Sequence, residues 1–405
     1  MDFQRRRQGS RGLLAVAAAL VAWAGVHAGE VRAAPLTPPQ QPPELPLEQL
    51  TVAALPAPDA YRLYLSDPTM GHLVDGRLHV IDARGMRYLG LLGTGFAGSS
   101  TLSRDRQSIL VASTYHSRLQ RGTRSDVVEV YGTKDLAFQY EIEIPAKHVQ
   151  SLPMRTLMGT SNDGRFLFIQ NATPATSVSV VDLHARKFVE EIPTPGCYGA
   201  IAWPDQARRF SSVCGDGRLA TFELDEQGVL KQRSVSEPFF DPDKDPIFAH
   251  YQWSGSRLTF VSYRGQVHEL DLRGTAPVAL KPWGLTDAAA AKQGWRPGGY
   301  QLFALDSRSG RLYVGMHDKG SEGSHKNPAK EIWVFDSQTQ RRIGRLPGQG
   351  AIGMALSHED KPSLFVLSAM ENRLLSFALS ERPPLARLLH RSEPVGETPV
   401  YMEMQ

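Results

Sequence analysis

Three glycines around one aromatic residue form the motif in this sequence that most resembles a cofactor site. Residues 93–98, GTGFAG, match the G-x-G-x-x-G pattern of dinucleotide-binding proteins. In those proteins a strand precedes the motif, and the helix that follows holds the pyrophosphate at its N-terminus. Here the preceding MRYLGLL is strand-like, but the following SSTLSRDRQSILVAST predicts a turn and another strand. The sequence therefore predicts a glycine-rich connection between two strand units and not a nucleotide site.

Other chemistry-bearing patterns point away from catalysis by this chain. The sequence contains no G-x-S-x-G, H-E-x-x-H, C-x-x-C-H or P-loop pattern. Its 12 histidines are scattered, and no pair has metal-ligand spacing together with a third ligand. We therefore predict no catalytic residue, no metal site and no cofactor held by this chain alone.

The N-terminus has the features of a secretory signal peptide. Four arginines precede a 14-residue apolar run, LLAVAAALVAWAGV, and small residues follow it. A membrane-spanning helix needs about 20 apolar residues, so an uncleaved anchor is the less favoured alternative. We place the signal peptide at residues 1–28, with the cleavage site between Ala28 and Ala34, and expect export.

Removal of the signal peptide also removes the basic excess of the chain. Residues 1–28 contain four of the 45 basic residues and one of the 42 acidic residues, which leaves 41 of each. A mature chain near zero net charge offers no broad electrostatic attraction to nucleic acid or to a membrane surface. We therefore expect neither as a partner.

The two cysteines, Cys197 and Cys214, are expected to pair in an exported protein. The sequence between them, YGAIAWPDQARRFSSV, predicts a strand, a turn at 203–206 and a second strand. Such a hairpin places the two cysteines opposite each other, within bridging distance. The disulfide would contribute about 3 kcal/mol to stability in the loop-entropy model.

The elements that position these residues are repeated strands. A unit of alternating strand, turn and alternating strand occurs seven times from residue 57 onward, about 49 residues apart on average, a period typical of β-propellers. Clear copies are RLHVIDARGMRYLGLL, SVSVVDLHARKFVEEI and EIWVFDSQTQRRIGRL, and a second motif of turn and apolar strand falls between copies. We predict an all-β, seven-bladed β-propeller with four-stranded blades over residues 57–405. A pair of β-sandwiches or a β-helix would not repeat in this way.

Two segments interrupt the strand pattern. Residues 29–56 form a proline-rich N-terminal arm, either a linker or a segment that lies on a partner. Within the propeller, LTDAAAAKQGW predicts a short helix with Thr286 as its N-cap, Asp287 in its first turn and an end near Gly294.

Long loops rich in charged and aromatic residues are candidates for binding a partner, because recognition usually lies on loops of a rigid scaffold. The first is TYHSRLQRGTRSDVVEV, which contains Arg118, Arg121 and Arg124. The others are GWRPGGYQLFAL and MHDKGSEGSHKNPAKEIWVFD, the latter with His325. The alternative is that these loops carry internal salt bridges that hold adjacent blades together.

These segments, together with GTGFAGSS and GCYGAI…VCGDG, resemble the heavy subunit of quinoprotein amine dehydrogenases. The resemblance covers the chain after the signal peptide, in the same order. It is nearer to the aromatic amine dehydrogenases than to the methylamine dehydrogenases. A stand-alone propeller binding protein and a metal-dependent propeller lactonase remain the alternatives.

The resemblance implies a periplasmic assembly of two heavy and two light subunits. The cofactor, tryptophan tryptophylquinone, would be made from two tryptophans of the light subunit. The complex would oxidise a primary amine to an aldehyde and ammonia and pass electrons to an azurin or amicyanin type copper protein. Except for Trp23 in the signal peptide, the tryptophans of this chain lie in predicted strands or loops, where we expect them to pack.

The resemblance also assigns a role to the opening motif. Phe96 stands at the position of a heavy-subunit phenylalanine that lines the substrate channel. The flanking glycines would let the backbone turn tightly and let another chain approach closely. Ordinary packing under the loop is the alternative. The cysteine pair also matches the disulfide of the family.

Overall fold

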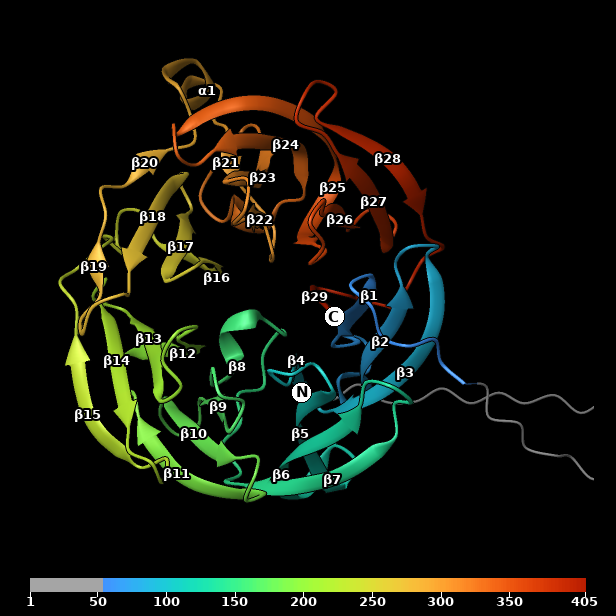
Figure 1. Ribbon diagram of the computed structural model, residues 1–405, viewed down its shortest axis with the longest axis vertical. Helices are drawn as coiled ribbons and strands as arrows, with labels where there is room; N and C mark the ends of the chain where they lie inside the picture. The colour runs from blue at the N-terminus through green and yellow to red at the C-terminus, as the bar shows by residue number, and fades with distance from the viewer. Residues whose placement is uncertain (1–53) are drawn as a thin grey trace, which may run out of the picture. The chain divides into compact units, whose positions relative to one another are not determined.

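The computed structural model describes residues 54–405, which form a ring of antiparallel sheets around a central axis (Figure 1). The predicted signal peptide and residues 29–53 of the predicted arm lie outside the described residues. In each of the first five sheets one strand lies nearest the centre and the others follow outward (Figure 1). This arrangement confirms an all-β propeller with four-stranded blades.

Each of the first five sheets has its strands in a simple order from the centre outward. The first sheet contains β29 (Tyr401–Met404), β1 (Arg62–Asp67), β2 (Gly76–Asp82) and β3 (Arg87–Gly95). The second contains β4 (Ser99–Leu102), β5 (Ser108–Arg118), β6 (Arg121–Gly132) and β7 (Phe138–Ile144). The third contains β8 (Met158–Thr160), β9 (Phe166–Asn171), β10 (Ser177–Asp182) and β11 (Lys187–Pro193). The fourth contains β12 (Cys197–Ala202), β13 (Arg209–Cys214), β14 (Leu219–Leu224) and β15 (Leu230–Val235). The fifth contains β16 (Ile247–Ser254), β17 (Arg257–Ser262), β18 (Gln266–Asp271) and β19 (Val278–Ala279), with β20 (Trp283–Gly284) also paired to β18.

The sixth sheet is twice as wide as the others. It contains β21 (Arg296–Pro297), β22 (Phe303–Asp306), β23 (Arg311–His317), β24 (Ala329–Asp336), β25 (Arg341–Leu356), β26 (Ser363–Ser368), β27 (Arg373–Leu379) and β28 (Ala386–Arg391). In β25, residues 341–347 pair with β24, and the stretch from Ala351 to Leu356 pairs with β26. The sheet therefore consists of two halves joined by one continuous strand.

The repeat seen in the sequence corresponds to a fixed part of each sheet. Its seven copies fold as antiparallel strand pairs, namely β2–β3, β6–β7, β10–β11, β14–β15, β18–β19, β24–β25 and β27–β28. The second motif supplies the strands β5, β9, β23 and β26. The strand–turn–strand interpretation of the repeat is thus confirmed.

The antiparallel order gives the ring two different ends. We call the end with the connections between successive sheets, and with the turns between the second and third strands of each sheet, the connection face. The other end, with the remaining turns, is the turn face. Backbone hydrogen bonds tie the connections to the neighbouring turns on the connection face, such as Ala97 N to Leu73 O (3.2 Å) and Phe239 N to Gly217 O (2.8 Å).

Short helical segments lie only between strands in the described residues. They are the 3₁₀ turns η1 (Leu73–Asp75), η2 (Arg155–Leu157) and η3 (Ser324–Lys326), and the helix α1 (Ala288–Lys292). The helix is where predicted, but its N-cap is Asp287 and not Thr286, because the Asp287 carboxylate accepts the Ala290 N–H at 2.8 Å. After the helix, Gly294 has a φ of +71°, as expected for a glycine that ends a helix.

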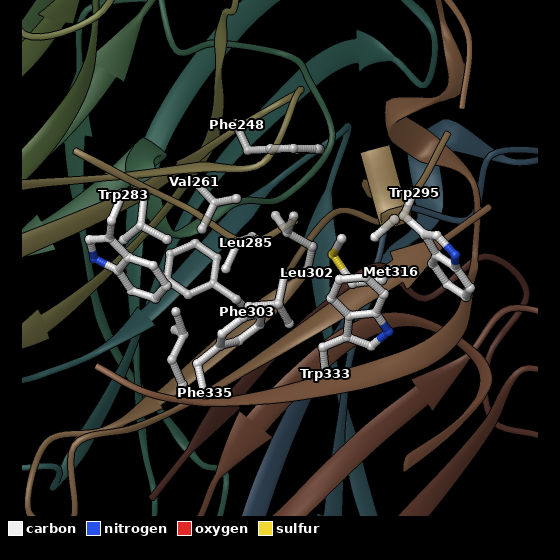
Figure 2. Close-up of a cluster of buried hydrophobic side chains, with 14 residues drawn as sticks. Phe248, Val261, Trp283, Leu285, Trp295, Leu302, Phe303, Met316, Trp333 and Phe335 are labelled. Carbon is white, nitrogen blue, oxygen red and sulfur yellow. The ribbon is translucent and has the colours of Figure 1, made fainter. Parts of the chain in front are cut away.

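The core consists of side chains packed between neighbouring sheets. In the cluster between the fifth and sixth sheets, aromatic side chains of both sheets point toward one another (Figure 2). Trp295 and Trp333 lie there with ring centroids 5.0 Å apart, and they are 7% and 0% exposed. Trp203 and Trp283 are also buried, and Trp253 is half-buried against a neighbouring buried cluster, which confirms the expected packing role of these five tryptophans.

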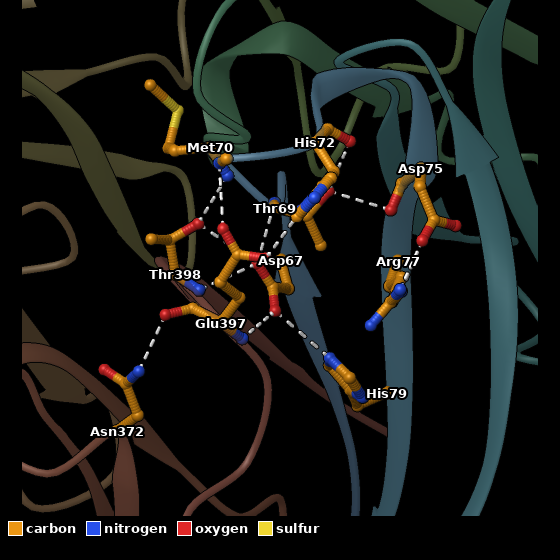
Figure 3. Close-up of polar contacts among 11 residues, drawn as sticks. Asp67, Thr69, Met70, His72, Asp75, Arg77, His79, Asn372, Glu397 and Thr398 are labelled. Atoms are coloured by element: carbon orange, nitrogen blue, oxygen red, sulfur yellow. Dashed lines mark hydrogen bonds and ion pairs between the residues drawn. The ribbon is translucent and has the colours of Figure 1, made fainter. Parts of the chain in front are cut away.

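The ring is closed by residues from both ends of the described chain. The last strand, β29, pairs with β1, so red and blue ribbons lie side by side (Figure 1). At the end of β1, the buried Asp67 accepts the backbone N–H groups of Glu397 (2.6 Å) and Thr398 (3.0 Å) (Figure 3). Burial alone would raise the pKa of Asp67, but hydrogen bonds from His79 and from backbone N–H groups hold it at about 2.

Candidate functional site

Phe96 lies on the connection face, in the turn that joins β3 to β4. Its backbone N–H donates to Thr114 O at 3.0 Å, and its ring meets the His116 ring edge-on, with centroids 5.8 Å apart. The side chain is half-buried, so part of the ring remains available for contact with another molecule. The motif is followed by strand β4, as the sequence predicted, and not by a helix.

Two of the three glycines of this motif, Gly95 and Gly98, are required by close backbone approaches, whereas a Cβ on Gly93 would meet open space. Gly95 has a φ of +63°, and a Cβ there would lie 2.9 Å from Thr114 O. A Cβ on Gly98 would lie 1.9 Å from Thr94 O. Ala97 between them also has a positive φ, of 48°. The glycines therefore allow a turn tight enough to place Phe96 at the junction of two sheets.

Next to Phe96, the strands β5 and β6 extend beyond their sheet as a hairpin. The inner neighbour β4 pairs with β5 only up to Ala112, and the outer neighbour β7 pairs with β6 only from Asp126. Residues 115–125 therefore project from the connection face. The side chains of Arg118 and Arg121 are exposed near the tip, and Leu119 between them is 69% exposed. Among residues 54–405, neither arginine has a carboxylate within 4.0 Å.

Arg124 has a different environment from the other two arginines. Its Nη2 lies 2.6 Å from Asp126 Oδ2 and also donates to His148 O at 2.8 Å. The Asp126 carboxylate is buried and accepts the His148 N–H at 2.8 Å. Arg124 thus fastens the base of the hairpin to the connection that precedes β8. This is the internal salt-bridging role that was the alternative to partner binding for these loops.

His325 lies on the connection face as well, but in the sixth sheet. Its ring stacks on Tyr263 with a centroid distance of 4.3 Å and an interplanar angle of 12°. Burial and the neighbouring Lys326 lower its pKa, so the ring is neutral at pH 7. In this state it can contact a partner as a flat, half-buried surface.

The two cysteines form the expected disulfide. Cys197 and Cys214 lie opposite each other in the β12–β13 pair, as the hairpin prediction required. Both side chains are buried, at the end of the pair that reaches the connection face. The bridge therefore stiffens this face in the fourth sheet.

All the predicted site residues lie on the connection face, but they do not form one cluster. Phe96 contacts His116 of the arginine hairpin, whereas His325 lies in η3, between β23 and β24 of another sheet. The strands β5 and β23 lie in different parts of the ring (Figure 1). Two features of this face were not predicted from the sequence. One is the contact of His116 with Phe96, which alternation along β5 does not reveal. The other is a set of exposed apolar side chains on turns of this face, namely Met70, Leu119 and Met370.

A buried carboxylate, that of Glu129, supports the hairpin formed by β5 and β6. Glu129 on β6 accepts from Ser113 Oγ (2.7 Å) and from the Tyr115 hydroxyl (2.9 Å). Burial and the Glu129 charge raise the pKa of Tyr115, which keeps its hydroxyl protonated as a donor. These contacts hold a loop in position, and they do not assemble a nucleophile with a base.

Two further observations concern residues 54–405. Within these residues, no cluster of three or more His, Cys, Asp or Glu side chains is suited to a metal ion. No helix in the described part of the chain has the length and apolarity to cross a bilayer.

The fold and this face define a β-propeller with a projecting hairpin and a glycine-framed aromatic residue on one end. Two solved structures resemble it at low identity. A protein from Lactobacillus plantarum is 12% identical with a TM-score of 0.61, over 85% of this chain and 99% of that one. A protein from Desulfotomaculum acetoxidans DSM 771 is 12% identical with a TM-score of 0.56, over 84% and 99%. These likenesses show the fold alone.

Comparison of sequences identifies the family. The model of the methylamine dehydrogenase heavy chain (MADH) family matches residues 59–387. The methylamine dehydrogenase heavy chain of Methylobacillus flagellatus is 29% identical over 334 residues, 82% of each chain. That of Methylorubrum extorquens is 28% identical over 325 residues, 79% of this chain and 77% of the relative. This chain belongs to the methylamine dehydrogenase heavy chain family and is a heavy subunit of a quinoprotein amine dehydrogenase.

Proposed function

We propose that this chain is the non-catalytic heavy subunit of a periplasmic amine dehydrogenase that oxidises aromatic primary amines to aldehydes and ammonia. Two heavy and two light subunits would form the complex, and a copper protein of the azurin or amicyanin type would accept its electrons. The observation that carries the proposal is Phe96, which a glycine-framed turn presents half-exposed on the connection face. The motif resemblance described above supports the aromatic class of substrate.

The cofactor would belong to the light subunit. Tryptophan tryptophylquinone supplies the electron acceptor for amine oxidation when it is present. The described tryptophans of this chain are a poor source for it, since Trp203, Trp295 and Trp333 each donate a hydrogen bond from Nε1 to a neighbouring side chain within packed surroundings. This chain would contribute the wall of the substrate channel at Phe96 and a docking surface at Arg118 and Arg121.

The propeller would have seven blades. The sixth sheet counts as two blades if β25 is divided where its pairing changes from β24 to β26. The seven copies of the sequence repeat support this count, because each supplies the two outer strands of one blade.

The first experiment is purification of the complex from the periplasm of its host, followed by a panel of amines. A copurifying small chain with a quinone absorption band, and a higher kcat/KM for phenethylamine than for methylamine, would support the proposal. Absence of the small chain would refute the subunit role. A preference for methylamine would refute only the aromatic class.

The second experiment tests Phe96 itself. Phe96→Ala should change the ratio of kcat/KM values across phenethylamine, benzylamine and methylamine, by about 1–3 kcal/mol for each altered apolar contact. The quinone absorption band should be unchanged. Phe138→Ala is the control, because Phe138 is 54% exposed on the outermost strand of the second sheet. Equal ratios in the wild type and Phe96→Ala would remove the channel role.

A further inference from the structure

A cavity of about 500 Å³ lies on the axis of the ring, near the turn face. It is lined by central strands of several sheets and by turns between first and second strands, including residues 103–104, 204 and 307. Phe96 and the arginine hairpin lie at the opposite end of the ring. We call this space, lined among others by Arg155, Tyr251, Gln252, Tyr401 and Glu403, the channel cavity.

The charge in the channel cavity is unbalanced. Its lining contains four arginines and two carboxylates, namely Arg104, Arg106, Arg155, Arg308, Asp306 and Glu403. Arg308 is paired with Asp360, which lies outside the lining, at 2.8 Å. The lining therefore retains an excess of positive charge even when that pair is discounted. Such a space favours an anion over a cation.

Arg155 is a half-buried cation in the wall of the channel cavity. Its Nη1 donates to Gln252 Oε1 at 3.0 Å, and its guanidinium carbon lies 5.0 Å from the centre of the Tyr251 ring. Among residues 54–405, no carboxylate lies within 4.0 Å of it. The charge of Glu403 acts on Arg155 from a greater distance, and no hydrogen bond joins the two. A guanidinium matches the two oxygens of a carboxylate. The remaining N–H groups of Arg155 are thus placed to receive one.

Other groups of the lining define which anion would fit. Burial raises the pKa of Tyr251 and of Tyr401, so both hydroxyls are protonated and can donate. Glu403 accepts from Leu102 N (3.4 Å) and Thr101 Oγ1 (3.3 Å). Burial raises the pKa of Glu403, and the charge of Arg155 and these hydrogen bonds oppose that rise. In its charged form Glu403 would repel a second negative charge on the ligand. Trp203 and Trp253 add aromatic surface that suits an organic body.

We infer that the channel cavity binds a small organic anion with a single carboxylate. The carboxylate is held by Arg155, and the body of the ligand lies against the tyrosine and tryptophan rings. Glu403 acts as the specificity-determining residue, because it excludes dicarboxylates. This site is separate from Phe96, so its occupation does not depend on the amine dehydrogenase activity proposed above.

The test is titration of the purified complex, as isolated from its host, with phenylacetate, succinate, inorganic phosphate and phenethylamine. Binding is followed by calorimetry and by tryptophan fluorescence, since Trp203 and Trp253 line the cavity. Phenylacetate should bind saturably and should change the fluorescence. The other three probes should bind at least 10-fold more weakly at this site.

Variants then assign the roles of the two charged residues. Arg155→Met should weaken phenylacetate binding at least 30-fold, and Arg155→Lys should weaken it less. Glu403→Gln keeps the acceptor oxygen for Leu102 and should improve succinate binding at least 10-fold. Arg387→Met is the control, because Arg387 is exposed on the outermost strand β28. None of these changes should alter the effect of Phe96→Ala on amine preference.

Three results would overturn the inference. They are absence of phenylacetate binding to the wild type, unchanged binding in Arg155→Met, and binding of phosphate or succinate to the wild type as tight as that of phenylacetate. If Arg155→Met does not fold, Glu403→Gln decides the matter, because it preserves the shape of the side chain. Unchanged discrimination between phenylacetate and succinate in that variant would then refute the site.

Discussion

The two faces of the ring differ in the range of the interactions that hold their turns. On the turn face, turns are capped locally, by an aspartate carboxylate that accepts a backbone N–H two or three residues later. Nine turns have this cap, at Asp82, Asp105, Asp135, Asp163, Asp182, Asp225, Asp271, Asp306 and Asp336. Each of these caps is formed within the turn itself, between residues two or three positions apart.

On the connection face the same local cap occurs at Asp67, Asp216 and Asp241, but other contacts there join distant parts of the sequence. The Asp67 carboxylate accepts the N–H groups of Glu397 and Thr398, which lie 330 and 331 positions later in the sequence. Arg124 donates to the carbonyl of His148, 24 positions later. The disulfide spans 17 residues. Because these loops are held by long-range contacts, they can differ in length and composition from sheet to sheet. The local caps therefore recur around the turn face, whereas the loops of the connection face differ from sheet to sheet.

The largest effect is expected from the closing contact of the ring. Asp67→Ala removes a buried carboxylate that accepts the N–H groups of Thr69, Glu397 and Thr398 and pairs with the buried His79. It should lower the free energy of unfolding by about 3–5 kcal/mol. The matched change on the turn face is Asp135→Ala, which removes one exposed cap and should cost about 1 kcal/mol or less. Denaturant unfolding of both variants measures the difference. Equal losses would contradict the contrast between the faces.

The same carboxylate gives the protein a pH dependence in acid. The folded pKa of Asp67, about 2, lies below the ordinary aspartate value of 3.8. Its contribution to stability is therefore present above pH 4 and is lost as the pH falls from about 4 to 2. Asp67→Asn should flatten this part of the stability curve.

The next largest effect is expected from the disulfide. Replacing both Cys197 and Cys214 by alanine should lower the free energy of unfolding by about 3 kcal/mol in the loop-entropy model. Reduction of the wild type with dithiothreitol should shift the unfolding midpoint in the same direction, which separates the bridge from the loss of the buried sulfurs. A midpoint that is insensitive to reduction would show that the bridge adds nothing to the rigidity of the connection face.

The projecting hairpin tests whether the connection face binds the partner. Reversal of both charges in Arg118→Glu with Arg121→Glu should weaken association with the light subunit by about 100-fold, since each changed contact at an interface costs about 1–2 kcal/mol. Arg387→Glu on β28 changes the same charge away from this face and should have no effect. Subunit titration measures both. Equal affinity in the hairpin variant and the wild type would place the partner elsewhere.

The smallest effect is expected from His148, which lies beneath the hairpin. Burial lowers its pKa to about 4, and neither ring nitrogen has a hydrogen-bond partner among the described residues. The unfolded state therefore binds more protons between pH 6.5 and 4, and stability should decrease as the pH falls through this range, by about 1 kcal/mol at pH 5.5. His148→Phe should reduce this slope but not remove it, because burial also lowers the pKa of His250, His268 and His358. Thermal unfolding at pH 5.5 and 7.5 measures the change. An unchanged slope would assign it to other groups.

The sequence determined the features of this protein that depend on short-range patterns. Alternation of apolar residues predicted the seven outer strand pairs, and the segment around residues 203–206 predicted the hairpin that aligns Cys197 with Cys214. The strand after GTGFAG was also visible in advance, because turn residues and apolar alternation follow within 15 positions. These are local preferences of the chain, and a repeat displays them several times over.

The tertiary structure alone decided the features that need residues distant in sequence. Nothing local indicates that Asp67 closes the ring with residues 397 and 398, that Arg124 turns inward while Arg118 and Arg121 stay exposed, or that β25 continues across two halves of a sheet. The channel cavity likewise gathers Arg155, Tyr251 and Glu403 from three different sheets or their connections. Closure of the ring brings these groups together. The proximity of these residues depends on the position of every sheet in the ring, so it cannot be predicted from a short stretch of sequence.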